Sequence, residues 1–277
     1  MLFENGQQSI SEENDVLTLS IISLIGDRDE QQDSYGYKLK DREGLIVICD
    51  GMGGHRGGQM AGKCAVERFL ADYNEEKGKE YLIKSAKESD LAISRLVDEK
   101  GELLRAGSTL VSVIVRENKL IWCSVGDSRA YLIRNGELVQ LTQDHNYRTV
   151  LIEKRNAGIL TEEEFLMEEK RGEALISYLG IGNLELIDYS EIPFELAKDD
   201  EIIMMSDGLY KLVSDDEIER LLDNFSNIRD AVWALEQKAR KNAKNYGVSR
   251  DNMSRTVIQI LPRQFYQDAP FWKSASM

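Results

Sequence analysis

Apolar, β-branched runs separated by turn residues recur along the chain, and they predict a fold built mainly from antiparallel strands. The expected strands cover residues 16–25, 34–40, 45–49, 109–116, 119–125, 129–134, 137–141, 185–194, 201–205 and 255–261. Hairpin-length connections join the four strands between 109 and 141, and Asn135-Gly136 is the strongest of these turn signals. We therefore expect these four strands to form a meander.

Helical spacing of apolar residues appears in other parts of the chain. The expected helices cover residues 59–77, 79–99, 214–225 and 226–246. Ser214 and Glu217 have the spacing of a helix cap, and Gly247 is a typical helix end. Residues 1–14 are polar, and we expect them to be mobile.

The order of these elements predicts one α+β domain of 277 residues, because no linker or repeat divides the chain. Its core is expected at about 16–262, with a peripheral tail at 263–277. Residues 144–185 interrupt the strands and form an insertion, which we interpret as a flap. Within it, Thr161 and Glu164 form a capping-box pattern that predicts the start of a short helix.

Composition and charge narrow the class of partner. The 49 acidic residues outnumber the 35 basic ones, giving a formal net charge of −14, which argues against nucleic acid as a main partner. Cys49, Cys64 and Cys123 are widely spaced and are expected to be reduced, and only two histidines are present, so a zinc site is not expected. No signal pattern or membrane-length apolar run is seen, which predicts a cytoplasmic protein without a membrane partner.

Acidic residues follow the ends of three apolar strands, at Asp50, Asp127 and Asp207. Two further acids, Asp33 and Asp251, each lie next to another expected strand. Antiparallel packing brings strand ends to one edge, where several carboxylates repel each other unless cations hold them. Carboxylate oxygens are the ligands that Mg²⁺ and Mn²⁺ prefer, so the pattern predicts a site for these metals.

Two other residues extend this candidate site. Gly51 has no side chain, so its carbonyl oxygen is accessible as a further metal ligand. Arg28, close in sequence to Asp33, is suited to bind an anion beside the metals. Two hard cations with an arginine favour attack on a phosphate group by a metal-bound hydroxide.

Seven short motifs in order make the chain resemble the metal-dependent protein phosphatase family, the type-2C serine/threonine phosphatases, and most closely its bacterial branch. The motifs are Arg28-x-x-Gln31-Gln32-Asp33, Asp50-Gly51-Met52-Gly53-Gly54-His55, Gly107-Ser108-Thr109, Val125-Gly126-Asp127-Ser128-Arg129, Leu141-Thr142-x-Asp144-His145, Ser206-Asp207-Gly208-Leu209 and Ser249-Arg250-Asp251-Asn252-Met253-Ser254. They span roughly residues 17–261. The resemblance implies a sandwich of two antiparallel β-sheets flanked by pairs of α-helices.

The resemblance also implies individual roles for the metal ligands. It implies that Asp50 bridges two metal ions and that Gly51 offers a carbonyl oxygen. Asp207 and Asp251 are implied as ligands of one metal, and Asp33 acts on the second metal directly or through water. The implied cofactors are two Mn²⁺ or Mg²⁺ ions, with a possible weaker third ion.

Asp127 is implied in that third site, and Arg28 is implied as the clamp for the phosphate group. The implied reaction is hydrolysis of phosphoserine and phosphothreonine in a phosphorylated protein substrate, within signalling that involves an opposing Ser/Thr kinase. The residues alone leave simpler readings open: Gly-Asp-Ser at Asp127 is an ordinary hairpin turn, and Arg28 suits a surface ion pair.

Two departures from the family pattern affect these expectations. Gln31 replaces the usual asparagine, and Met52 replaces a histidine that many eukaryotic members have as an implied general acid. Methionine has no titratable proton, so water or another group must protonate the leaving oxygen. The alternatives are a non-catalytic phosphoprotein-binding module of the same fold and a phosphatase for small phosphate esters.

Overall fold

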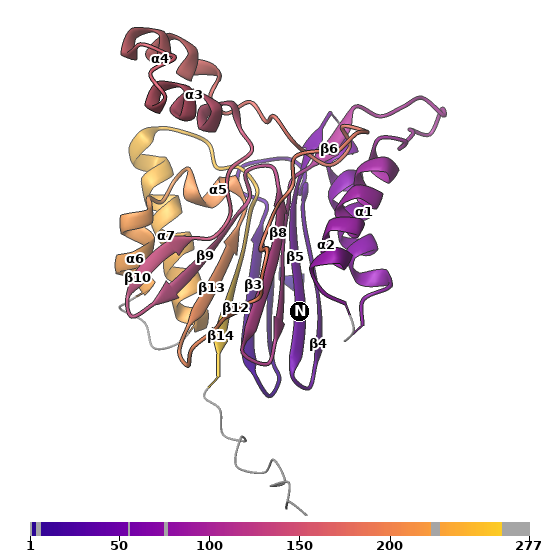
Figure 1. Cartoon of the computed structure of the whole chain (residues 1–277), viewed down its shortest axis with the longest axis vertical. Helices are drawn as coiled ribbons and strands as arrows, with labels where there is room; N and C mark the ends of the chain where they lie inside the picture. Colours follow the sequence, from indigo (N-terminus) through magenta and orange to yellow (C-terminus); the bar gives the residue numbers. More distant parts are fainter. Residues whose placement is uncertain (1, 4–6, 55, 75–76, 223–227, 262–277) are drawn as a thin grey trace, which may run out of the picture.

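Two antiparallel β-sheets pack face to face, and helices cover their outer faces, as Figure 1 shows for the computed structural model. The structure describes residues 2–3, 7–54, 56–74, 77–222 and 228–261. This arrangement confirms the predicted α+β sandwich with flanking helices. Within the described residues, no helix is long and apolar enough to cross a membrane.

The first sheet has the order β1-β2-β3-β14-β13-β9-β10. Its strands are β1 (Leu2–Phe3), β2 (Gln7–Glu13), β3 (Leu17–Leu24), β14 (Met253–Ile260), β13 (Glu201–Met205), β9 (Arg129–Arg134) and β10 (Glu137–Gln140). Strand β14 therefore lies between β3 and β13, so the end of the described chain completes the middle of this sheet.

The second sheet has the order β11-β8-β7-β5-β4, with β12 also paired to β8 and β6 to β5. Its strands are β11 (Asp188–Tyr189), β8 (Lys119–Val125), β7 (Leu110–Arg116), β5 (Glu43–Gly53), β4 (Asp33–Lys40), β12 (Phe194–Glu195) and β6 (Ala106–Ser108). Strand β5 is longer than the apolar run at 45–49, because Gly51 to Gly53 continue it by pairing with β6.

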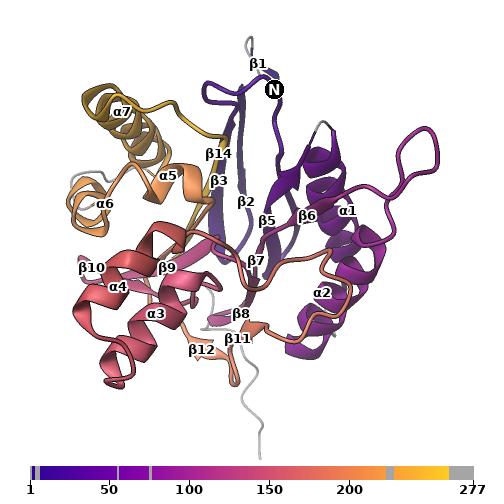
Figure 2. The same ribbon diagram turned by 90° about the horizontal axis from the view of Figure 1, so that it is seen from above.

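Helices lie on both outer faces and at one end. Figure 2 shows α3 and α4 on the same side of the molecule as α5, α6 and α7, away from α1 and α2. The helices are α1 (Gly57–Ala71), α2 (Lys79–Ile93), α3 (Tyr147–Asn156), α4 (Glu162–Glu168), the 3-10 helix η1 (Glu169–Arg171), α5 (Asp207–Tyr210), α6 (Asp215–Leu222) and α7 (Ile228–Tyr246). The capping box at Thr161 and Glu164 is confirmed at the start of α4.

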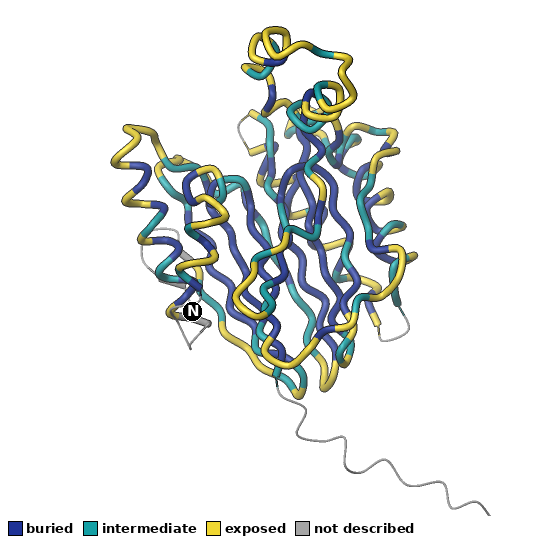
Figure 3. Tube along the Cα trace, turned by 60° about the vertical axis from the view of Figure 1, so that its left-hand side comes forward, coloured by how far each residue is buried: buried dark blue, intermediate teal, exposed yellow. Residues whose placement is uncertain are grey.

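The core is layered. One buried cluster, including Leu19, Ile48 and Val113, lies between the two sheets. A second joins α1 and α2 to the second sheet, and a third joins α5, α6 and α7 to the first. Figure 3 shows buried backbone along the strands and exposed positions on the helices and the flap. Burial of apolar side chains on both faces makes the sheets a rigid base for the loops at their ends.

The predicted meander from residue 109 to 141 is wrong. Strands β7 and β8 pair in the second sheet, whereas β9 and β10 pair in the first, so the chain crosses between the sheets at 126–128. Gly126 has φ +93°, and its N–H donates to Nδ1 of the buried His145 at 3.2 Å. Strand β13 takes the position beside β9 that β8 was expected to have. Asp127 therefore lies at the junction of the sheets and not in a simple hairpin.

Two other local predictions also fail. Residues 7–13, expected to be mobile, form β2 and pair with β3. Residues 185–194 contain only the short strands β11 and β12 and not one long strand. Pro193 has no N–H to donate, and Trp122 N of β8 bonds to the side chain of Ser190, so regular pairing is interrupted. The single-domain organisation stays a prediction, and the predicted tail at 263–277 lies outside the described residues.

The contact between His145 and Gly126 gives a pH prediction. Burial lowers the pKa of His145 below its usual 6.5, and Asp188 and Asp144 only partly oppose this. His145 has a lower pKa in the folded protein than in the unfolded chain. The stability that neutral His145 contributes is therefore present above pH 6.5 and is lost as the pH falls. We therefore expect acid to destabilise the wild type more than His145→Asn, whose side-chain oxygen accepts the same bond without titrating. Thermal unfolding midpoints of both proteins at pH 7.5 and 5.5 measure this; equal losses would contradict the assignment.

Candidate functional site

Asp33 and Asp50 face each other across the β4–β5 pair, because the register of this hairpin makes them partners. Two bonds to Thr109 fix the backbone of Asp50: its N–H donates to Thr109 Oγ1 at 3.0 Å, and its carbonyl accepts from Thr109 N at 2.8 Å. Thr109 Oγ1 is also 2.7 Å from Ser128 Oγ, which ties the end of β5 to the sheet crossing. The second sheet therefore contributes two acids at a rigid strand end.

Asp207 and Asp251 come from the first sheet. Asp207 directly follows β13 as the first residue of α5, and Asp251 precedes β14, the neighbour of β13. Ser206 connects the sheets, because its Oγ donates to Asp33 Oδ2 at 2.9 Å. Strand ends from both sheets thus meet at one place, as predicted.

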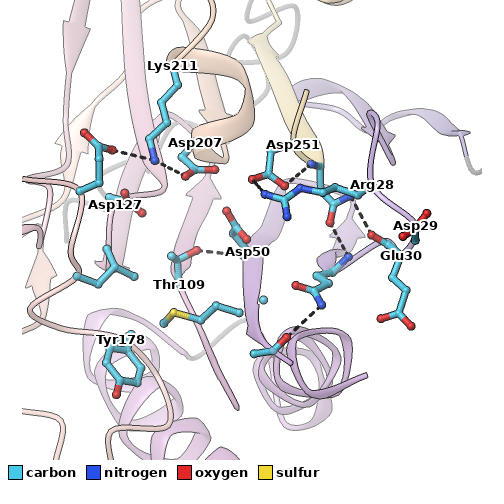
Figure 4. A pocket seen from close by; sticks show the side chains of 17 residues that line it. Arg28, Asp29, Glu30, Asp50, Thr109, Asp127, Tyr178, Asp207, Lys211 and Asp251 are labelled. Atoms are coloured by element: carbon cyan, nitrogen blue, oxygen red, sulfur yellow. Dashed lines mark hydrogen bonds and ion pairs between the residues drawn. The ribbon is translucent and has the colours of Figure 1, made fainter. Parts of the chain in front are cut away.

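One cleft of about 940 Å³ collects the predicted residues. Figure 4 shows Asp50 between Asp207 and Asp251, with Asp127 beyond Asp207 and Arg28 beside Asp251. Six of the seven predicted residues line it: Arg28, Asp50, Gly51, Asp127, Asp207 and Asp251. The seventh, Asp33, is buried behind the lining, at 5% exposure.

Burial and mutual repulsion make these carboxylates hard to ionise together. Burial raises the pKa of Asp33 to about 7, and Asp207 and Asp251 add repulsion, although bonds from Ser206 and Ser254 oppose the rise. Burial also raises the pKa of Asp50 well above its usual value, with Asp33 and Asp207 next in effect. For Asp127, burial and then Asp207 raise the pKa to about 6. The cluster therefore requires positive charge to be fully ionised at neutral pH.

Two side-chain cations currently supply part of that charge. Arg28 Nη2 donates to Asp251 Oδ2 at 2.5 Å, and Lys211 Nζ donates to Asp207 Oδ2 at 2.6 Å. Within the described ranges, no three Asp, Glu, His or Cys side chains are gathered closely enough to enclose an ion. Each of these ion pairs engages only Oδ2 of its aspartate.

The residues present nevertheless fit hard divalent cations. Asp33 Oδ1 is buried and has no hydrogen-bond partner, which is costly for a carboxylate unless a cation or water completes it. At Gly51 a Cβ would lie 2.0 Å from the Gly58 carbonyl oxygen, so only glycine allows the backbone to approach here. The donors are all oxygens, without thiolate or imidazole, which suits Mg²⁺ and Mn²⁺.

Sequence reasoning missed several residues of the cleft. Asn252 accepts from Gln32 N at 2.8 Å and donates to Ile25 O and Glu30 O, so it positions the loop that carries Arg28. Lys211 and Glu173 line the cleft and pair at 2.8 Å. The i, i+4 spacing of Asp207 and Lys211 was a usable signal for their ion pair. No local pattern indicated Glu173, which comes from the flap.

Comparisons with known proteins identify similar sequences. The family model described as protein phosphatase 2C matches residues 17–150. The chain is 29% identical over 251 residues to the serine/threonine phosphatase stp of Listeria innocua, covering 87% of this chain and 95% of that protein. It is 26% identical over 245 residues to a putative protein phosphatase of Mycoplasma genitalium, covering 84% of this chain and 91% of that protein.

Solved structures show the same fold. The Mycobacterium tuberculosis serine/threonine phosphatase PstP/Ppp superposes with a TM-score of 0.74 at 26% identity, covering 89% of this chain and all of that one. A structure of the PstP catalytic domain in complex with two manganese ions gives a TM-score of 0.72 at 25% identity, covering 89% and 99%.

Fold, motifs and relatives together define a metal-dependent phosphatase architecture. The chain is similar over most of its length to bacterial serine/threonine protein phosphatases, which are hydrolases, and its residues 17–150 match the protein phosphatase 2C family model.

The repulsion at Asp50 predicts an effect on the stability of the metal-free protein. Asp50→Asn removes one buried negative charge, so we expect the variant in chelator at pH 7.5 to be more stable than wild type by on the order of 1 kcal/mol. Added Mn²⁺ should stabilise the wild type and have much less effect on the variant. Urea unfolding with and without Mn²⁺ measures both; a variant less stable than wild type in chelator would contradict the repulsion.

Proposed function

We propose that this chain hydrolyses phosphoserine and phosphothreonine in proteins at the cleft between its sheets, with two Mn²⁺ or Mg²⁺ ions held by Asp33, Asp50, Gly51, Asp207 and Asp251. The observation that carries the proposal is the convergence of buried carboxylates from both sheets on one cleft. A cluster of this kind costs stability unless it binds cations, so its presence in the cleft favours a role that uses them.

When bound, the two ions supply a nucleophilic water of lowered pKa and neutralise charge on the phosphate group. Asp50 pairs with Asp33 across β4 and β5 and lies between Asp207 and Asp251 in Figure 4, so it would be suited to hold both ions. Asp33 is anchored by Ser206 through one oxygen, which leaves its unpartnered Oδ1 for the second ion or for a water on it.

Arg28 lies at the rim of the cleft, and its guanidinium has five N–H donors, of which Asp251 accepts one at Nη2. The remaining donors are suited to bind the non-bridging oxygens of the phosphate and to orient it for in-line attack. Met52 also lines the cleft and has no proton to give, so the leaving serine or threonine oxygen takes its proton from water or another group.

The openness of this site to solvent and the flap beside it favour a protein substrate. Glu173 and Leu175 from the flap insertion line the cleft next to Asp207, so a substrate at the metals also contacts the flap. A phosphorylated protein substrate implies an opposing Ser/Thr kinase as a functional partner. Cytoplasmic location stays a prediction, in line with the free thiols of Cys49, Cys64 and Cys123.

The metal requirement is tested with a phosphothreonine peptide. We expect no phosphate release in chelator and recovery with Mn²⁺ or Mg²⁺, because all proposed ligands are hard oxygens. Asp207→Asn and Asp251→Asn should each lower kcat by at least about 100-fold at saturating Mn²⁺, since each removes a ligand.

The matched control is Asp216→Asn, an exposed acid of α6 outside the cleft, which should retain wild-type turnover. Circular dichroism establishes that each variant is folded. Full activity in chelator after metal removal would exclude the metal mechanism and favour a non-catalytic or metal-independent role for the cleft.

Arg28 has a separate test. Arg28→Ala should lower kcat/KM for the phosphopeptide by roughly 10- to 100-fold, the range expected for a charge-assisted hydrogen bond. Metal affinity should stay equal or become tighter, because the substitution also releases Asp251 from its ion pair. Calorimetry and steady-state kinetics on Arg28→Ala, with Arg28→Lys for comparison, separate the two effects. Loss of metal binding with unchanged kcat/KM would show that Arg28 acts on Asp251 and not on phosphate.

A further inference from the structure

Lys211 is the positively charged side chain placed closest to the proposed metal ligands on the α5 side of the cleft. It follows Asp207 by one helical turn, and its Nζ lies 2.6 Å from Asp207 Oδ2. The same nitrogen lies 2.8 Å from Glu173 Oε2 of the flap. Both acids hold the ammonium at the cleft that Lys211 lines, and Figure 4 shows Lys211 directed towards Asp207, although 39% of the side chain remains exposed.

Asp127 is the third acid near this ammonium. It lines the same cleft, and Lys211 and Asp127 attract each other electrostatically. The ammonium therefore pairs directly with Asp207 and Glu173 and shares the cleft with Asp127. Nearby carboxylates in a chain with a net charge of −14 favour a cation at this position, and the Lys211 ammonium occupies it.

This placement conflicts with the expectation of a third metal ion at Asp127. A divalent ion bound to Asp127 and sharing Asp207 needs carboxylate oxygens at about 2.0–2.6 Å. The ammonium already lies at hydrogen-bond distance from Asp207, so an ion there would meet an adjacent positive charge. Glu173 opposes outward movement of Lys211, because the ion pair links Lys211 to the flap.

We propose that Lys211 is a tethered cation that takes the place of a third divalent ion, so that this chain binds a metal pair and no third ion at Asp127. The proposal rests on the proposed function, since it assumes the pair held by Asp33, Asp50, Gly51, Asp207 and Asp251. It assigns Lys211 the neutralisation of Asp127 and of the outer oxygen of Asp207. It also makes the charge at this position permanent and independent of the free metal concentration.

The test is the number of Mn²⁺ ions bound per chain, measured by calorimetry and by electron paramagnetic resonance of free Mn²⁺. Wild type should bind two ions. Lys211→Met keeps the length of the side chain and removes its charge, so it should bind one additional, weaker ion. Lys211→Arg retains the charge and should bind two. Glu173→Gln retains Lys211 and should also bind two, which controls for loss of the ion pair alone.

A double variant, Lys211→Met with Asp127→Asn, locates the additional ion. It should return to two ions, because the third ion requires the Asp127 carboxylate. Three ions on wild type, two on Lys211→Met, or an additional ion that persists without Asp127 would each overturn the proposal. A wild type that binds no ions at all would instead overturn the proposed metal pair and, with it, this inference. Thermal unfolding of each variant establishes that the stoichiometry refers to folded protein.

Discussion

Repulsion among buried carboxylates is the constraint on which the rest of this structure depends. Asp33 is buried, and Asp50 lies close to it and to Asp207, so burial and mutual repulsion raise the pKa values of Asp33 and Asp50. A stable fold tolerates this only because the strands that carry the acids are held from both sides by apolar layers. Cation binding would relieve the repulsion among these carboxylates, and the packed sheets hold them rigidly in place.

The crossing of the chain between sheets explains why the site is a cleft and not a flat edge. If β7 to β10 had formed a meander, Asp127 would project from a hairpin at the end of one sheet. Because the chain crosses at Gly126, Asp127 lies between the sheets, and Thr109 and Ser128 connect the crossing to Asp50. The bond from Gly126 to His145 also places the start of the flap beside this crossing. One backbone turn therefore sets the position of Asp127 and the point from which the flap leaves the sandwich.

Most single elements were predictable because their signals are local. The β-branched runs predicted β3, β13 and β14 closely, and the acids at their ends predicted the site. Which strands become neighbours was not predictable in the same way, because pairing of β9 with β13 is decided by packing between distant segments. The same applies to the side chains that surround the acids. Lys211 is near Asp207 in sequence, but the contact with Glu173 depends on where the flap folds back, which no local pattern encodes.

The position of β14 in the first sheet has a consequence for the folding of the chain during its synthesis. This strand is the last one described, yet it pairs with β3 on one side and β13 on the other, and Asp251 and Asn252 directly precede it. Asn252 holds the loop of Arg28, more than 220 residues earlier in the chain. During synthesis β3 and β13 of the first sheet therefore have no strand between them until residues 251–260 have left the ribosome. Until then the nascent chain lacks Asp251 and the Asn252 side chain that holds the loop of Arg28, so the proposed site is incomplete.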